Sequence, residues 1–167
     1  QCSDNTWQAY NRWPDQFSLY DDGEDECIFC VPPETDRDRE RHVVVRRPDC
    51  IAILNRYPYN NGHLLVAPKR HVAGLGDLTD DELSGLMELV RDCVGLLERT
   101  LGPHGYNIGL NLGRAAGAGI LDHLHFHIVP RWTGDTNFMP ATANTKVMPQ
   151  SLDALWDLLR ETLDARQ

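Results

Sequence analysis

The segment His123–Val129 has the sequence HLHFHIV, in which histidines alternate with apolar residues. Successive side chains of a β-strand point to opposite faces of a sheet. The segment therefore predicts a strand with His123, His125 and His127 on one face and the intervening apolar side chains against a core. Three imidazoles in register concentrate metal-binding or nucleophilic capacity on one surface. We therefore expect the functional site on this face.

The composition indicates one globular domain. The chain has 167 residues, of which 41% are hydrophobic and 25% charged, enough to bury a core. The formal net charge of −9 argues against a broad basic surface, so no nucleic-acid partner is expected. No apolar run approaches the roughly 18 residues that span a bilayer, and no secretory signal pattern opens the sequence. No membrane partner is expected either.

The five cysteines are scattered along the chain, except that Cys27 and Cys30 form a C-x-x-C pair. An odd, dispersed set does not indicate a disulfide framework, so a reducing, cytoplasmic location is expected. The pair itself has three interpretations: two thiols in a turn, a redox pair, or half of a zinc site. A redox pair is typical of a thioredoxin-like βαβ context, which the sequence does not indicate, and half a zinc site requires two further ligands.

Hydrophobic periodicity predicts an α+β fold with an antiparallel sheet. Short β-branched runs bounded by turn residues predict strands over residues 43–46, 50–54, 63–68 and 105–112. A glycine-rich loop, residues 113–119, leads into the histidine strand. Pro130 is expected to end that strand.

Two helices are expected. Thr79 and Glu82 have the spacing of a capping box, and Gly102 followed by Pro103 is typical of a helix C-terminus. The apolar residues of this first helix that recur at helical spacing are expected to face the core: Leu83, Leu86, Met87, Val90, Val94 and Leu97. Ser151 is the expected N-cap of a second helix that runs to Leu163.

Three motifs together resemble the histidine-triad (HIT) superfamily of nucleotide hydrolases and transferases. They are the H-x-H-x-H-x-x pattern of His123–Val129, the spacing from Asn55 to His63, and the sequence PKRH that ends at His71. The tail RWTGDTNFMP, residues 131–140, resembles the bacterial branch of ATP adenylyltransferases and diadenosine tetraphosphate phosphorylases. The resemblance implies a HIT-like fold: an antiparallel β-sheet with a long helix after the third strand and a C-terminal helix.

The resemblance also implies a domain organisation. Residues 27–140 would form the HIT domain, and residues 141–167 a C-terminal helical extension of the same domain. Residues 1–26, which carry interspersed aromatic side chains, are expected to form an N-terminal arm that packs on the domain. A homodimer is expected by analogy with the superfamily.

The same resemblance assigns three catalytic histidines. His125 would be the nucleophile that attacks the α-phosphorus of a nucleoside polyphosphate and forms a nucleotidyl-histidine intermediate. A neutral imidazole suits this chemistry when an acceptor, here a strand carbonyl, holds the proton of its other nitrogen. His127 and His63 would flank the phosphate, and protonation of the leaving group would fall to His127.

A substrate-binding set follows from the resemblance as well. Asn55 matches the position that binds the ribose hydroxyls, and the phosphate contacts match Asn111 and the backbone of Gly117, Ala118 and Gly119. Successive amides of a glycine-rich loop can form an anion-binding concavity. Some relatives carry Gln or Ser shortly before the triad, where this chain has the sequence GILD, residues 119–122. This departure leaves open whether water or inorganic phosphate is the acceptor.

Some bacterial relatives bind a structural zinc, and their ligand positions correspond to Cys27, Cys30, His71 and His123. Two thiolates and two imidazoles suit tetrahedral Zn²⁺. The alternative is that the thiols are free and His123 has only a structural role.

The function implied is cleavage of the α-phosphate linkage of adenine nucleotides or dinucleoside polyphosphates, with inorganic phosphate as acceptor in a phosphorylase. Two alternatives stay open: a hydrolase of dinucleoside polyphosphates or AMP conjugates that uses water, and a nucleotide-binding module with little turnover.

Overall fold

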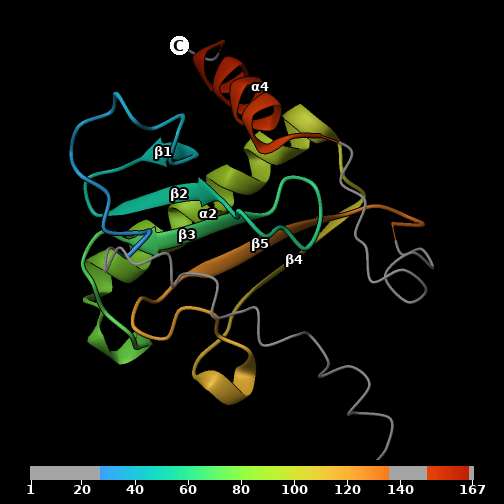
Figure 1. The fold of residues 1–167 in the computed structure, drawn as a ribbon. Helices are drawn as coiled ribbons and strands as arrows, with labels where there is room; N and C mark the ends of the chain where they lie inside the picture. The colour runs from blue at the N-terminus through green and yellow to red at the C-terminus, as the bar shows by residue number, and fades with distance from the viewer. Residues whose placement is uncertain (1–26, 136–149, 166–167) are drawn as a thin grey trace, which may run out of the picture.

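The computed structural model describes residues 27–135 and 150–165. The arm predicted for residues 1–26 lies outside the described residues, as does much of the segment before the last helix. Within the described ranges the strands form one antiparallel sheet with the order β1-β2-β3-β5-β4 (Figure 1). The strands are β1 (Val43–Arg46), β2 (Cys50–Leu54), β3 (Leu64–Pro68), β4 (Gly105–Leu110) and β5 (Phe126–Arg131).

Two α-helices are present in the described ranges, α2 (Asp80–Leu101) and α4 (Leu152–Asp164), with short 3-10 turns η2 (Leu75–Asp77) and η3 (Arg114–Ala116). The α+β fold with a long helix after β3 and a C-terminal helix is therefore confirmed. No helix among the described residues combines the length and the apolar character needed to cross a membrane.

The predicted ends of the helices are confirmed. The Thr79 side chain accepts a hydrogen bond from the Glu82 amide, and the Glu82 carboxylate accepts one from the Thr79 amide, so the capping box is complete. Gly102 ends α2 in the left-handed conformation with φ of 56°. Ser151 caps α4 through the Ala154 amide.

The predicted core face of α2 is wrong in part, because the buried arc is rotated around the helix axis. Leu83 and Met87 are 39% and 46% exposed. The residues that α2 buries are Leu86, Leu89, Val90, Cys93, Leu96 and Leu97. The apolar residues of α2 are spread over a wide arc of the helix, so periodicity alone does not specify which part of that arc meets the sheet.

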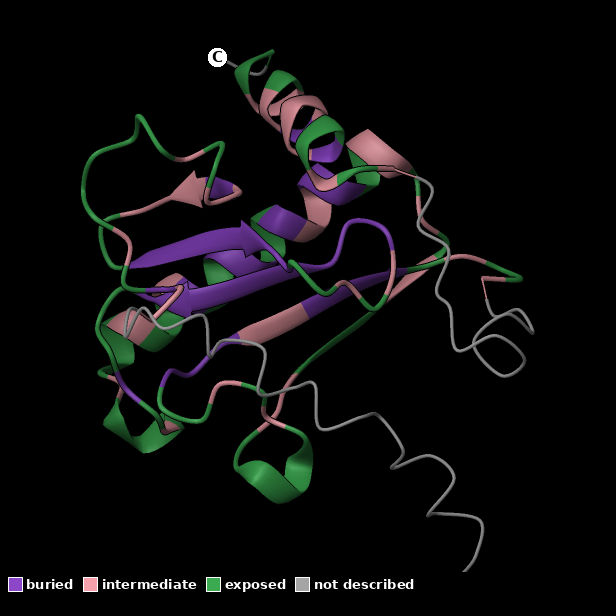
Figure 2. Cartoon of the chain, viewed as in Figure 1, coloured by how far each residue is buried: buried purple, intermediate pink, exposed green. Residues whose placement is uncertain are grey.

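The sheet is buried on both faces at its centre, where β2 and β3 are buried along their whole length (Figure 2). One face packs against α2 and α4 in a large apolar cluster. Every second side chain of β2 and β3 points to the other face. There Ile51, Ile53, Leu65 and Ala67 form a smaller cluster with Phe29, which precedes β1 in the chain. Side-chain alternation therefore gives the sheet two apolar faces.

The histidine strand differs from the prediction at both ends. β5 begins at Phe126, so His123 and His125 precede it, and Pro130 lies inside it. Pro130 is tolerated because β3 pairs with β5 only as far as Ile128, while Pro130 faces Tyr106 on the other neighbouring strand. A residue without an N–H fits where one neighbouring strand has ended.

Candidate active site and metal centre

The second face of the sheet carries the histidine site. His127 on β5 pairs with Leu65 on β3, so its side chain lies on the face that carries the smaller apolar cluster. The rings of His125 and His127 have centroids 4.9 Å apart, and those of His127 and His63 are 5.2 Å apart. The structure therefore brings His63, His125 and His127 together.

The hydrogen bonds of His125 define its tautomer. Its Nδ1 lies 2.8 Å from the carbonyl oxygen of His123. A carbonyl can only accept, so Nδ1 carries the proton and Nε2 keeps its lone pair. His125 is buried, with 6% of its surface exposed. Burial lowers its pKa, whereas the bond to the His123 carbonyl acts in the opposite direction.

The tautomer of His63 follows from a backbone donor. The Tyr59 amide donates to His63 Nδ1 at 3.0 Å, and the Asn55 amide group also lies 3.2 Å from this nitrogen. Because Nδ1 accepts, Nε2 carries the proton and donates to His127 Nδ1 at 3.0 Å. His63 is fully buried. It contacts the ring of His127 on the Nδ1 side, opposite the His127 Nε2 atom.

The proton of His127 is consequently on Nε2. This nitrogen is buried and has no hydrogen-bond partner within the described part of the chain. Burial, with a smaller contribution from His125, lowers the pKa of His127 to about 4. At neutral pH His127 therefore presents a neutral, unpaired N–H donor, an arrangement that suits an anionic oxygen of a ligand.

Asn55 is buried beside His63. Its side-chain oxygen accepts from the Tyr57 amide at 2.9 Å, while its amide nitrogen lies against His63 Nδ1. An asparagine side chain offers two N–H donors and two acceptor lone pairs. These contacts use one of each, so one donor and one acceptor remain for a ligand.

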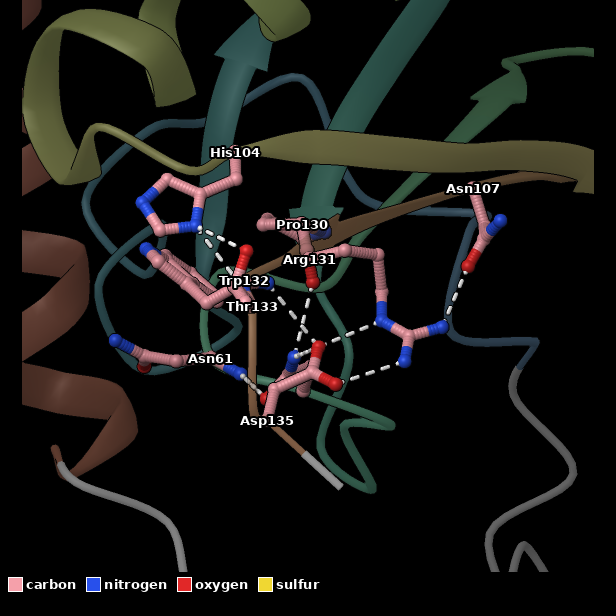
Figure 3. A network of polar contacts seen from close by, with 9 residues as sticks. Asn61, His104, Asn107, Pro130, Arg131, Trp132, Thr133 and Asp135 are labelled. Carbon is pink, nitrogen blue, oxygen red and sulfur yellow. Dashed lines mark hydrogen bonds and ion pairs between the residues drawn. The ribbon is translucent and has the colours of Figure 1, made fainter.

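The loop between β2 and β3, residues 55–63, is tied to the end of β5 by a polar network centred on Asp135 (Figure 3). Asn60 donates to the Asp135 carboxylate at 2.9 Å and to the Pro130 carbonyl at 3.0 Å. Arg131 pairs with the same carboxylate through two nitrogens, at 2.7 and 2.8 Å. The network fixes the loop that presents the Tyr59 amide to His63.

The glycine-rich loop lies between β4 and β5. Gly113 and Gly117 adopt φ of 83° and 82°, a region that favours glycine. The Asn111 amide donates weakly to the Gly117 carbonyl at 3.4 Å, so Asn111 is joined to the loop. Gly117 and Gly119 are exposed, and Ala118 is half-buried between them. Ile120, just beyond, packs against the cluster that contains Phe29.

Cys27, Cys30, His71 and His123 converge into one cluster, in which all four ligand atoms lie within 4.8 Å of one another. Ligand atoms of a tetrahedral zinc site stand about 3.3–3.8 Å apart, given the usual Zn–S and Zn–N lengths. Cys27 Sγ and Cys30 Sγ lie 3.2 Å from the Nδ1 atoms of His123 and His71 respectively. The cluster therefore fits a tetrahedral ion after small adjustments.

The protonation of the cluster suits metal binding. His123 Nε2 donates to the Pro68 carbonyl at 2.8 Å, so Nδ1 presents its lone pair to the sulfurs. Burial lowers the pKa of His123, which keeps the ring neutral. Burial, together with Cys27, raises the pKa of the Cys30 thiol to about 11, so metal binding must release a thiol proton.

Two aromatic residues of the site were missed by sequence reasoning. Phe29 is fully buried and packs against His123 and His125. Tyr59 stacks on His127 with an interplanar angle of 9°. Phe29 is an apolar residue inside the C-x-x-C pair, and Tyr59 lies in a loop rich in Pro and Asn. Only their position inside or beside the C-x-x-C pair and the segment from Asn55 to His63 could have suggested them.

Comparisons with known proteins identify the family of this chain. Residues 36–134 match the family model of the HIT domain. The chain is 48% identical over 115 residues to a Mycobacterium tuberculosis (strain H37Rv) protein named AP-4-A phosphorylase, covering 69% of this chain and 59% of that relative. The chain thus spans about three fifths of the length of that relative.

Two further relatives cover more of their own length. The adenosine 5'-monophosphoramidase hnt1 of Schizosaccharomyces pombe is 31% identical over 129 residues, covering 77% of this chain and 92% of hnt1. The solved structure of the hypothetical histidine triad nucleotide-binding protein ST2152 from Sulfolobus tokodaii is 28% identical, with a TM-score of 0.65 and coverage of 83% and 93%. The family model matches more than half of the chain, and the chain belongs to the HIT family.

Proposed function

We propose that this protein is a nucleotidyl transferase that cleaves adenine dinucleoside polyphosphates at the α-phosphate and uses inorganic phosphate as acceptor. The observation that carries the proposal is the arrangement of ring nitrogens. His125 has a free Nε2 lone pair, and His127 directs an unpaired N–H from the same face. A nucleophile beside a hydrogen-bond donor suits attack on phosphorus.

In the first step, His125 Nε2 attacks the α-phosphorus, and the bond from phosphorus to the bridging oxygen breaks. The products are adenylyl-His125 and, from diadenosine tetraphosphate, ATP. The Nδ1 proton stays on the ring, where the His123 carbonyl stabilises the charge that the imidazole gains. The nucleotide leaves as an anion, so a hydrogen bond from His127 Nε2 to the bridging oxygen stabilises its developing charge.

In the second step, an oxygen of inorganic phosphate attacks the adenylyl phosphorus, the phosphorus–nitrogen bond breaks, and ADP leaves. His125 returns to the neutral tautomer held by the His123 carbonyl. His63 acts in both steps as a positioning residue, because its Nε2 proton fixes His127 with Nδ1 as acceptor and Nε2 as donor.

We assign substrate binding to two places. The remaining donor and acceptor of Asn55 suit the two ribose hydroxyls of the adenylyl group. Asn111 and the backbone of Gly117, Ala118 and Gly119 would contact phosphate oxygens, a role supported by the exposure of the glycines.

We also propose that Cys27, Cys30, His71 and His123 hold a structural zinc ion. The support is the donor set of two sulfurs and two neutral imidazole nitrogens in a cluster of tetrahedral size. When bound, the ion would fix the N-terminal segment to the chain just before β5. Metal analysis should find about one zinc per chain. The Cys30→Ser variant should retain much less, and full retention would contradict the ligand assignment.

The test of the reaction is the dependence of the products on phosphate. Diadenosine tetraphosphate incubated with the protein and inorganic phosphate should give ADP and ATP. Without phosphate, products should be formed only slowly. AMP and ATP as the products in both conditions would contradict the phosphorylase and favour a hydrolase that uses water. The second candidate has support from the similarity to hnt1.

A nucleotide-binding module with little turnover is distinguished by trapping. Acid-quenched protein should carry a covalent adenylyl group in the wild type and none in His125→Ala. Absence of the adduct, together with normal nucleotide binding, would favour the binding module.

The location and assembly of the protein are further proposals. A cytoplasmic location is supported by Cys50 and Cys93, whose buried thiols form no disulfide bond. A homodimer is supported by β4, which forms an outer edge of the sheet and exposes Ile108 at 47%.

A further inference from the structure

Phe29 connects the metal cluster to the proposed nucleophile. Its ring centroid lies 4.9 Å from that of His125 at an interplanar angle of 31°, and 5.0 Å from that of His123. The residue is fully buried, although it belongs to a short segment outside any helix or strand. An aromatic ring in this position restricts how the His125 imidazole can tilt.

The hydrogen bond of His125 alone does not fix its ring. The bond from Nδ1 to the His123 carbonyl sets the tautomer and anchors one edge. The ring can still tilt about that contact, and the direction of the Nε2 lone pair would change with it. His127 contacts the ring at an interplanar angle of 56°. Phe29 supplies a second ring contact, so the His125 imidazole packs against both Phe29 and His127.

The placement of Phe29 depends on the turn that carries it. Cys27 and Cys30 flank the residue, and the Cys30 amide donates to the Cys27 carbonyl at 3.0 Å to close the turn. Both sulfurs reach His123 Nδ1, at 3.2 and 3.8 Å. Ligands before and after Phe29 therefore hold its backbone, while the second apolar face of the sheet receives its ring.

We propose that Phe29 is a positioning residue for His125, and that the four metal ligands affect nucleotidyl transfer through it. This inference rests on the proposed function, in which His125 is the nucleophile. The C-x-x-C turn thereby has a role beyond stability, because it holds an aromatic ring in contact with the reacting imidazole. Misplacement of a reacting group by about 1 Å can cost about 10²-fold in rate.

The first experiment compares Phe29→Ala and Phe29→Leu with Ile28→Ala, a control in the same turn that packs against the same apolar cluster. With phosphate and diadenosine tetraphosphate, Phe29→Ala should lose about 10²-fold in kcat with little change in KM. Phe29→Leu should lose part of this, and Ile28→Ala should keep kcat. All should retain bound zinc. Phe29→Leu keeps most of the buried volume, so it serves if Phe29→Ala does not fold.

The second experiment removes the metal with a chelator from the wild type and from the folded Phe29 variant. If Phe29 transmits the effect, metal removal should lower kcat of the wild type and have little further effect on the variant. Losses that multiply would overturn the proposal, since the His123 carbonyl would then carry the effect independently.

A measurement without substrate separates this inference from the proposed function. Long-range ¹H–¹⁵N spectra of the histidine rings report the tautomer and the number of environments of His125. The wild type should give one Nδ1–H form, and the Phe29 variants and the chelated protein should give a mixture or broadened signals. Unchanged spectra and unchanged kcat in Phe29→Ala would overturn the proposal. A wild type that shows the ordered ring but no nucleotidyl transfer would instead contradict the proposed function.

Discussion

Replacement of Asp135 by alanine should destabilise the protein strongly, although the residue belongs to an ion pair near the surface. Its carboxylate, on a side chain 11% exposed, accepts from Asn60 at 2.9 Å and from the Trp132 amide at 3.2 Å. Hydrogen bonds to a charged group contribute about 1.5–3 kcal/mol each. Arg131 is 44% exposed, so its pair with Asp135 contributes only about 0.2–1 kcal/mol. The loss should be about 3–7 kcal/mol, mostly from the two less exposed bonds.

The assay is urea denaturation monitored by tryptophan fluorescence and circular dichroism. Arg131→Gln is the matched control, because it removes the ion pair and leaves Asn60 and the Trp132 amide bonded to Asp135. It should cost at most about 1 kcal/mol. Asp135→Ala should also lower kcat, since Asn60 ties down the loop that presents the Tyr59 amide to His63. Equal destabilisation by the two variants would refute the reasoning, because the exposed ion pair would then carry the energy.

Three further predictions concern the site and the assembly. The low pKa of His127, about 4, lies below its unfolded value, so it contributes stability above pH about 6.5 that is lost as pH falls toward 4. This contribution is about 1–3 kcal/mol after solvent screening, and it should be absent from the pH profile of His127→Asn; an unchanged profile would contradict it. Gly109 pairs with His127, and a Cβ there would meet no atom within 4 Å. Gly109→Val should therefore raise KM by about 10–100-fold with little change in Tm, whereas an unchanged KM would mean that substrate does not occupy this face. Ile108→Lys should shift the sedimentation of a dimer toward a monomer, and an unaltered dimer would exclude the outer edge of β4 as the interface.

The local signals of the sequence predicted the secondary structure well because each depends on few neighbouring residues. The capping box of Thr79 and Glu82, Gly102 after the helix and Ser151 before α4 are all present. The convergence of Cys27, Cys30, His71 and His123 came from the family resemblance. Their spacing along the chain does not define a common point in space, and the folded sheet brings their ligand atoms together.

Predictions that depended on which face of a helix or strand packs against a neighbouring element were wrong in part. The buried arc of α2 is rotated away from Leu83 and Met87, because the sheet selects among several apolar positions. The alternation of His123–Val129 correctly suggested a shared face for the histidines, yet only His127 lies within β5. Pro130 did not end the strand, because the end of β3 pairing leaves it room.

The sequence by itself determined the types of element, the helix ends and the supply of imidazoles and thiols. These follow from backbone propensity, capping and side-chain chemistry, which act over a few residues. Only the tertiary structure decided the tautomers of His63, His125 and His127, because each proton position depends on a contact made in the folded chain. His63 accepts from the Tyr59 amide and His125 donates to the His123 carbonyl, both nearby in the sequence, whereas His127 accepts from the ring of the distant His63. It also placed Phe29 against His125. The positions of the donors and acceptors in the site therefore depend on the folded loop around Tyr59 and on the contact between His63 and His127, which the sequence pattern does not specify.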